Sequence, residues 1–187
     1  MRGRRFLSKP VIIGTLLLGL VVAGAGLYWF QPWKLWTDRT VREELPAAAA
    51  PRGDGAAAPR GDGAAAAPRT LAEGRFISHE HGTRGTVRIL RLADGSRTLR
   101  LEGLDTSNGP ALRVWITDAP VQQGTAGWRV FDDGAYVDLG ALKGNKGDQN
   151  YALPASADLD DLTSVSIWCE RFSVSFGAAE LRATAAA

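Results

Sequence analysis

The sequence predicts an all-β domain, an antiparallel sandwich or partly closed barrel, preceded by one transmembrane helix and a disordered linker. Three observations predict this organisation: an uncharged apolar run over residues 11–30, an Ala/Pro/Gly-rich repeat over residues 46–69, and period-two alternation after Thr70. The chain therefore divides into four segments: a basic cytoplasmic flank (1–10), a transmembrane signal-anchor helix (11–30), a juxtamembrane and linker segment (31–69), and an extracytoplasmic β domain (70–185).

The apolar run is long enough to cross a membrane, because about twenty helical residues span roughly 30 Å. Basic residues precede it (Arg2, Arg4, Arg5, Lys9) and aromatic residues follow it (Tyr28, Trp29, Trp33, Trp36). By the positive-inside rule the N-terminus stays cytoplasmic and the C-terminal domain lies outside, with the aromatic residues at the outer interface. We therefore predict a single-pass protein of the cell membrane whose residues 11–30 contact the lipid bilayer.

A cleaved signal peptide is the alternative to the anchor. Ala23-Gly24-Ala25 matches the small-residue pattern of a cleavage site after Ala25. The apolar run continues through Phe30, however, and an aromatic flank is typical of an anchor, so the anchor is favoured.

The linker contains a repeat of eight residues. Ala-Pro-Arg-Gly-Asp-Gly-Ala-Ala occurs at residues 50–57 and again at 58–65. No apolar side chain larger than Ala or Pro is present between residues 46 and 69, so the segment cannot bury a core and is predicted to be disordered. The Arg-Gly-Asp tripeptides match an integrin motif, but charged spacers that keep the linker soluble are the favoured interpretation.

Short apolar runs separated by turn signals predict the strands of the domain. They include Val87 and Ile89; Leu99 and Leu101; Leu112, Val114 and Ile116; Val165, Ile167 and Cys169; and Phe172, Val174 and Phe176. The last two sets differ in parity, so a two-residue turn or a bulge at Glu170-Arg171 would bring them to one face and put Cys169 beside Phe172. In either case Cys169 points to the apolar side and Trp168 points away.

Composition and missing motifs narrow the function. Residues 70–187 carry twelve Lys/Arg and fifteen Asp/Glu, a slightly acidic balance that argues against nucleic-acid binding. The chain has no Gly-x-Ser-x-Gly or His-Glu-x-x-His motif, so a classical hydrolase is not expected. One cysteine cannot form a disulfide within the chain.

A few residues could carry chemistry. Cys169 is a candidate redox thiol or metal ligand, although its alternation pattern also fits a buried, inert thiol. His79 and His81 would share one face of a strand as a two-ligand metal pair, or form a polar strand end that leads into a turn. Lys143 to Gly147 suits a glycine-rich hairpin loop better than a phosphate site. Trp115, Trp128 and Trp168 are either core residues or a ligand platform, and the pattern does not decide between them.

Four segments in order resemble the DM-thirteen domain, the Skeletor-type module often labelled an electron-transfer domain and found beside DOMON domains in animals. They are Gly74-Arg75-Phe76 with His81 to Val87; Leu101 to Pro110; Leu139 to Pro154; and Val165 to Cys169 with Phe172, Val174, Phe176, Ala179 and Leu181. The resemblance covers about residues 72–182. One departure is Ala111, which stands where the family usually carries an acidic residue.

The resemblance implies a redox or electron-transfer role, with the cysteine of the Trp-Cys motif, Cys169, as the redox residue; of the two histidines it supports only His81. One thiol carries electrons through a partner or as a ligand to a metal or haem, and no motif establishes either cofactor. The leading hypothesis is a membrane-anchored extracytoplasmic redox module with a redox or envelope partner. The alternative is a non-catalytic binding or adhesion module on a flexible stalk.

Overall fold

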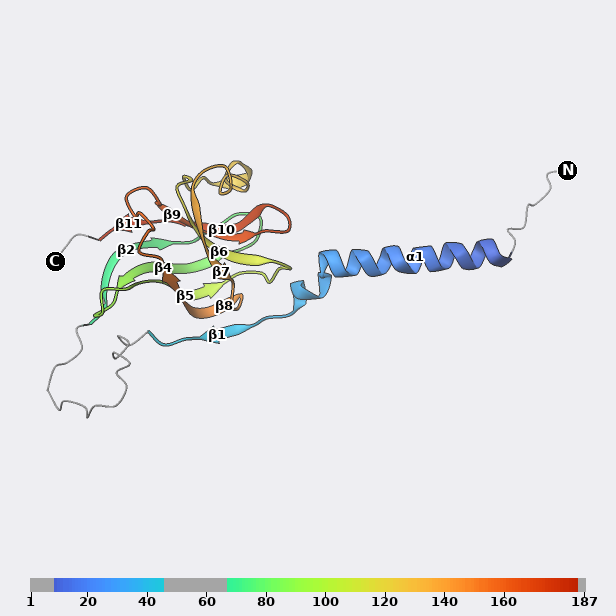
Figure 1. The fold of residues 1–187 in the computed structure, drawn as a ribbon, viewed down its shortest axis with the longest axis horizontal. Coiled ribbons are helices and arrows are strands. Elements are labelled where there is room, and N and C mark those ends of the chain that lie inside the picture. Colours follow the sequence, from blue (N-terminus) through green and yellow to red (C-terminus); the bar gives the residue numbers. More distant parts are fainter. Residues whose placement is uncertain (1–8, 46–66, 185–187) are drawn as a thin grey trace, which may run out of the picture.

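Two β-sheets pack around a common core in the computed structural model, which describes residues 9–45 and 67–184 (Figure 1). The elements are α1 (Lys9–Phe30), η1 (Pro32–Trp36), β1 (Thr40–Arg42), β2 (Arg69–Arg75), β3 (Ile77–Ser78), β4 (Arg84–Arg91), β5 (Arg97–Asp105), β6 (Leu112–Thr117), η2 (Gly124–Gly127), β7 (Tyr136–Ala141), β8 (Lys146–Leu153), β9 (Ser164–Cys169), β10 (Val174–Glu180) and β11 (Arg182–Ala183). The predicted all-β class and the single apolar helix before it are confirmed.

The strand order is β1-β8-β5-β4-β2-β11 in one sheet, sheet A, and β3-β10-β9-β6-β7 in the other, sheet B. Neighbouring strands run antiparallel, except for β1, which lies parallel to β8. The alternating aliphatic residues of both sheets meet between them. Val87, Ile89, Leu101, Val114 and Ile167 are fully buried there, so the period-two pattern correctly identified the inner face.

A second, aromatic cluster covers the outer face of sheet B. It consists of Trp115, Ala119, Phe131, Trp168 and Ala178, with Val121 and Val130 packed against it. Every residue of β9 is consequently buried, on both faces of the strand. Trp168 therefore faces a second apolar cluster rather than solvent, which decides an alternative that the sequence left open.

The β9–β10 hairpin differs from the predicted pairing. Cys169 lies opposite Val174 rather than beside Phe172, and Glu170 to Ser173 form a four-residue loop. Glu-Arg does not favour the positive φ angles of a two-residue turn; instead Ser173 adopts a φ of 46°. A bulge between Ser175 and Gly177 then shifts the register.

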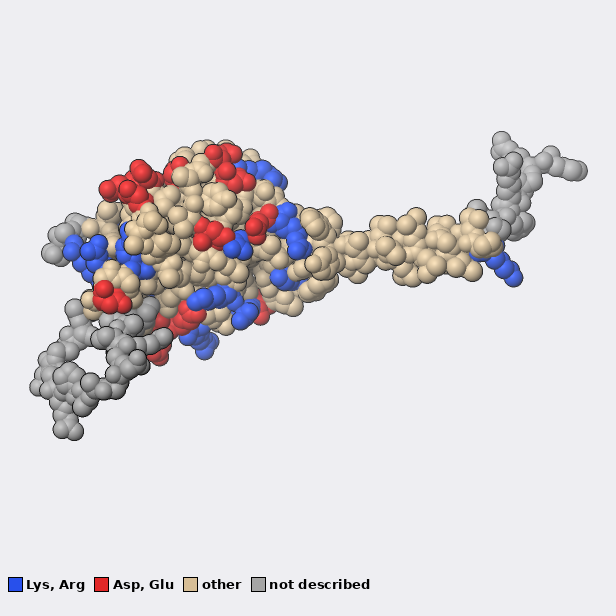
Figure 2. Space-filling model, in the orientation of Figure 1, with Lys and Arg blue, Asp and Glu red and all other residues tan. Residues whose placement is uncertain are grey.

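Helix α1 extends away from the domain (Figure 1) and, among the described residues, is the one helix long and apolar enough to cross a membrane. None of its residues is buried within the described structure. Figure 2 shows charged side chains of both signs scattered over the visible face of the domain, whereas α1 carries none after Lys9. The chain therefore has the features of a single-pass membrane anchor.

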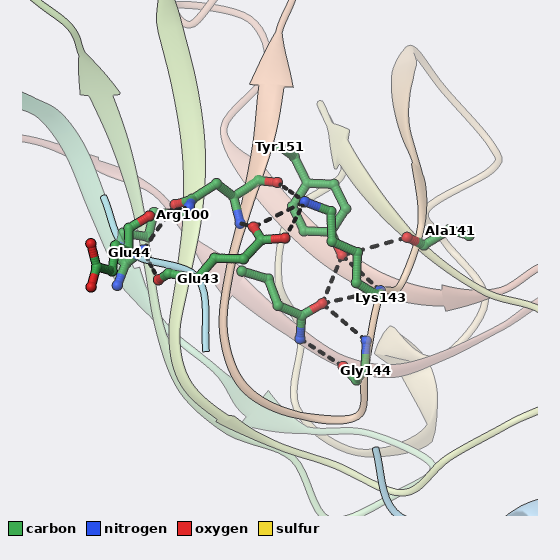
Figure 3. Close-up of polar contacts among 9 residues, drawn as sticks. Glu43, Glu44, Arg100, Ala141, Lys143, Gly144 and Tyr151 are labelled. Atoms are coloured by element: carbon green, nitrogen blue, oxygen red, sulfur yellow. Dashed lines mark hydrogen bonds and ion pairs between the residues drawn. The ribbon is translucent and has the colours of Figure 1, made fainter. Parts of the chain in front are cut away.

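Residues 31–45 attach α1 directly to sheet A. Strand β1 pairs with β8 from Thr40 to Arg42. This close approach needs a glycine at position 147, because a Cβ there would lie 2.0 Å from the Val41 carbonyl oxygen. The carboxylate of Glu43 accepts hydrogen bonds from Lys143 Nζ at 2.7 and 2.9 Å and from the backbone N–H of Asn150 at 2.7 Å (Figure 3).

Part of the segment predicted as juxtamembrane and linker is thus a strand of the domain. The reason is the edge of sheet A, where β8 offers unpaired backbone groups that β1 satisfies. The eight-residue repeat, predicted to be disordered, lies within residues 46–66, outside the described residues.

Candidate functional site

Cys169 is the last residue of β9 and lies between two neighbouring strands. It pairs with Leu112 of β6 and Val174 of β10. Its side chain is fully buried and belongs to the aliphatic cluster between the sheets. The predicted orientation of Cys169 towards the apolar side is confirmed.

Burial raises the pKa of the Cys169 thiol, and the negative charge of Glu80 adds to this effect. Backbone N–H groups of Phe172, Arg171 and Ala111 oppose it by favouring the thiolate. Burial is the largest cause, so the thiol stays protonated in the folded domain. Ala111, which departs from the family pattern, therefore acts on the sulfur through its backbone.

A mostly apolar cavity of about 210 Å³ lies where the domain meets α1. Its walls come from the end of α1, η1, the turn after β3, the loop between β5 and β6, and the β9–β10 hairpin. The lining residues include Phe30, Pro32, Leu35, Glu80, His81, Asn108, Pro110, Phe172 and Phe176. Cys169 does not line this cavity. Phe172 does line it, and its backbone N–H donates to the Cys169 carbonyl oxygen at 3.2 Å, so Cys169 lies next to the cavity wall.

The β9–β10 loop contacts the C-terminal end of α1. Arg171 Nη1 donates to the carbonyl oxygens of Trp29 at 2.5 Å and Tyr28 at 3.3 Å. Its guanidinium also lies 5.2 Å from the centre of the Trp29 ring. Phe172 stacks on Phe30 with ring centroids 5.7 Å apart. Arg171 thereby satisfies carbonyl groups that a helix end leaves without partners.

The two histidines follow β3 instead of lying on it, because the strand ends at Ser78. The His81 ring packs against Phe176 in a tilted arrangement, with ring centroids 4.0 Å apart and an angle of 40° between the rings, and its Nε2 lies 3.2 Å from the Glu80 carboxylate. Of the two interpretations that the sequence left open, a polar strand end that leads into a turn agrees with these positions.

His79 is held by hydrogen bonds at both ring nitrogens. Its Nε2 lies 3.0 Å from the Gln122 carbonyl oxygen and its Nδ1 lies 2.8 Å from Ser175 Oγ. A carbonyl oxygen only accepts, so Nε2 carries the proton and Nδ1 accepts from Ser175. Burial lowers the pKa of His79. In the part of the chain that the structure describes, no group of three or more His, Cys, Asp or Glu side chains could hold a metal ion.

The glycine-rich loop between β7 and β8 is occupied by the protein's own side chains. Gln149 Oε1 accepts from the backbone N–H groups of Lys143 and Gly144 at 3.1 and 3.2 Å, and its Nε2 donates to the Gly144 carbonyl oxygen at 2.6 Å. The Tyr151 hydroxyl lies in the same network (Figure 3), and burial raises its pKa to about 12. These backbone groups are not free to bind a phosphate, so the hairpin-loop interpretation agrees with the structure.

Sequence reasoning missed an aromatic stack on sheet B. Tyr136 stacks on Trp115 with ring centroids 4.1 Å apart, and Trp115 stacks on Trp168 at 5.1 Å. The three residues lie on neighbouring strands β7, β6 and β9, at diagonal positions of the sheet. The out-of-phase position of Trp168 beside Cys169 was the signal in the sequence, but its partners come from strands that are distant along the chain.

The comparison with protein families gave one match. The family model described as "Electron transfer DM13" matches residues 75–181, which include both histidines, the aromatic stack and Cys169. The searches of curated proteins and of solved structures returned no match. The match covers more than half of the chain and agrees with the resemblance found in the motifs, so the chain belongs to the DM13 family of electron-transfer domains.

Proposed function

We propose that this chain is a membrane-anchored electron-transfer domain in which Cys169 is the redox-active group. The observation that carries this proposal is the position of the only cysteine. It lies in the region that the family model matches, at the end of the domain that contacts α1, next to the wall of the cavity between the domain and α1. A redox group in this place is close to the membrane while the bulk of the domain shields it from water.

The surroundings of Cys169 limit the chemistry that it performs. A protonated, buried thiol is a poor nucleophile, so disulfide exchange with a soluble thiol does not occur in the closed domain. One-electron oxidation remains: the thiol gives an electron to a one-electron oxidant, loses its Sγ proton and becomes a thiyl radical. We assign Glu80, whose negative charge raises the pKa of the thiol, as the acceptor of that proton.

The orientation in the membrane follows from charge. We place residues 1–10 in the cytoplasm and the β domain outside, because the basic residues precede α1 and the aromatic residues follow it. Fusion of alkaline phosphatase after residue 187 tests this placement in a bacterial host. Enzyme activity is expected, and an inactive fusion present at full length would contradict the orientation.

The redox role is tested on the full chain in detergent. Treatment with a one-electron oxidant such as hexachloroiridate(IV), in the presence of a spin trap, should leave a trap adduct on the peptide that contains Cys169. Cys169→Ala is the control and should lose that adduct. If the folded wild-type protein gives no adduct on Cys169, the redox role of this residue is wrong. A visible spectrum and metal analysis of the same sample show whether a metal or haem is bound.

A binding module displayed at the membrane is the second candidate. It is favoured by the sealed thiol and by a separate cleft of about 660 Å³ whose lining includes Arg75, Arg88 and Arg182 beside Glu73 and Glu180. This mixture of charges would take a polar group of an envelope polymer. A Cys169 that never oxidises in the folded protein, together with polymer binding that Arg88→Gln weakens, would favour this function over electron transfer.

A further inference from the structure

The aromatic stack connects solvent to the interior of sheet B. Tyr136 is 45% exposed, Trp115 is 5% exposed and Trp168 is 1% exposed. The rings of Tyr136 and Trp115 are nearly parallel, with an angle of 9° between them, and those of Trp115 and Trp168 meet at 25°. The stack is therefore continuous from the surface at β7 to the central strand β9.

Tyrosine and tryptophan are, with cysteine, the side chains most easily oxidised by one electron. Stacked rings at these separations allow an electron to pass in short steps. We propose that Tyr136, Trp115 and Trp168 form a one-electron relay between the outer surface of sheet B and the strand that carries Cys169.

A buried indole without a hydrogen-bond partner supports the relay. Trp115 Nε1 is buried and has no partner among the described residues, which is costly for a polar group and calls for an explanation. An oxidised indole next to a base loses its N–H proton and is trapped as a neutral radical. Without an acceptor, the Trp115 radical cation keeps its proton and can take an electron from Trp168. Trp128 Nε1 is also buried without a partner, but no stacking contact joins it to Tyr136, Trp115 or Trp168, so it serves as a matched control.

A one-electron oxidant, such as an oxidised metalloprotein docked at β7, takes an electron from Trp115 through the stacked ring of Tyr136, whose phenol keeps its proton. Trp168 in turn gives an electron to the Trp115 radical cation. The hole ends on Trp168, and the oxidant has gained one electron.

The last step, in which Cys169 is the electron donor, rests on the proposed function. Trp168 and Cys169 are joined by a peptide bond, although their side chains face opposite sides of β9. Cys169 gives an electron to the Trp168 radical cation and loses its Sγ proton; Glu80, whose negative charge raises the pKa of the thiol, is the acceptor assigned above. The thiyl radical that remains is the oxidised product, and Trp168 is restored.

The relay is tested without the thiol first. A ruthenium photo-oxidant is attached to the full chain through Asp133→Cys, an exposed position three residues before Tyr136, in a Cys169→Ala background so that one thiol is labelled. A flash should produce an indole radical in transient absorption. Trp115→Phe should suppress most of that signal and leave a tyrosyl radical, whereas Trp128→Phe should leave the signal unchanged.

Trp115→Phe must keep its fold, which circular dichroism and urea unfolding check. If it does not, Tyr136→Phe replaces it, because this exposed residue can be changed without loss of the core, and a slower indole signal is then expected. An indole signal that neither substitution alters, or the absence of any indole radical with the stack intact, overturns the relay.

A second arm restores Cys169 and adds the spin trap, with the label confined to residue 133 by peptide mapping. A thiyl adduct on Cys169 that Trp115→Phe abolishes supports both the relay and the proposed function. Relay without an adduct at Cys169 contradicts only the role of the thiol. An adduct at Cys169 formed equally in Trp115→Phe contradicts only the relay.

Discussion

The two faces of β9 differ in chemistry, although they belong to one strand. On the inner face, Val165, Ile167 and Cys169 lie in an aliphatic core. On the outer face, Ser166 and Trp168 lie among hydroxyl groups and stacked aromatic rings. The central strand of this domain is therefore enclosed on both sides, with its thiol on one side and the stacked rings of Trp168 and Trp115 on the other.

The largest expected effect comes from truncation of a ring on the outer face. Trp168→Ala removes a side chain that is 1% exposed and leaves a cavity beside Trp115 and Phe131, so we expect a loss of about 3–5 kcal/mol in the free energy of unfolding. Ile167→Ala, on the inner face, should cost about 2–5 kcal/mol. Urea unfolding of the full chain in detergent measures both. A loss below about 1 kcal/mol for Trp168→Ala would mean that the outer face is not a packed core.

A polar substitution distinguishes the faces by their hydrogen bonds. Cys169→Ser puts a hydroxyl in the aliphatic cluster and should cost about 1–3 kcal/mol, whereas Cys169→Ala should cost less because no polar group is buried. On the outer face, Ser166 Oγ donates to Ser175 Oγ at 3.0 Å, so Ser166→Ala should cost about 1 kcal/mol through the lost hydrogen bond. Equal stability of Cys169→Ser and wild type would show that the sulfur has polar surroundings.

The pH dependence of stability tests the buried histidine next to the outer face. The pKa of His79 in the folded domain is lowered from 6.5 by burial, so the unfolded chain binds the proton more readily. The contribution of His79 is therefore fully present above pH 6.5 and decreases as the pH falls towards the folded pKa. Unfolding free energies at about pH 7 and about pH 5 should differ more in wild type than in His79→Gln.

His81→Gln is the matched control for that measurement, because His81 is partly exposed and its ring packs, tilted, against Phe176 in the wall of the cavity beside α1. It should keep most of the pH dependence seen in wild type. A pH dependence unchanged by His79→Gln would contradict the assignment of the effect to this residue.

The smallest effect is expected far from both faces. Lys143→Gln removes the ion pair with Glu43 that fastens the segment after β1. Both side chains are about one-third exposed or more, so water screens the pair and the loss should stay below about 1 kcal/mol. Urea unfolding measures this value, and a loss as large as that of Trp168→Ala would make the β1 attachment, rather than β9, the main support of the domain.

Period-two alternation was sufficient to predict the inner face, because every second side chain of a strand points to the same face of its sheet. It could not predict the docking of β1, since Thr40 to Arg42 is too short to show a period; the only local signals were Gly144 and Gly147, where a Cβ would meet the backbone of this segment. It also could not predict the register of the β9–β10 hairpin, which depends on the bulge at Phe176. That bulge lies where Gly177 packs against Thr83, and a Cβ there would approach Thr83 Cβ to 2.5 Å.

The candidate site was predictable in part. The orientation of Cys169 followed from alternation, and its proposed redox role came from the resemblance of the Trp-Cys motif. The cavity beside it could not be predicted, because its walls come from α1, η1, the turn after β3, the β5–β6 loop and the β9–β10 hairpin, which only the tertiary structure brings together. The partners of Trp168 were hidden for the same reason.

We infer that the folded domain keeps the Cys169 thiol sealed and protonated, which leaves one-electron exchange as its proposed chemistry. The rate of its alkylation by a maleimide, measured on the full chain across a urea series, tests this most directly, because the chain has one cysteine. The rate should be negligible in the native protein and should rise in parallel with global unfolding. A thiol that reacts in native protein as fast as in unfolded protein would contradict the claim.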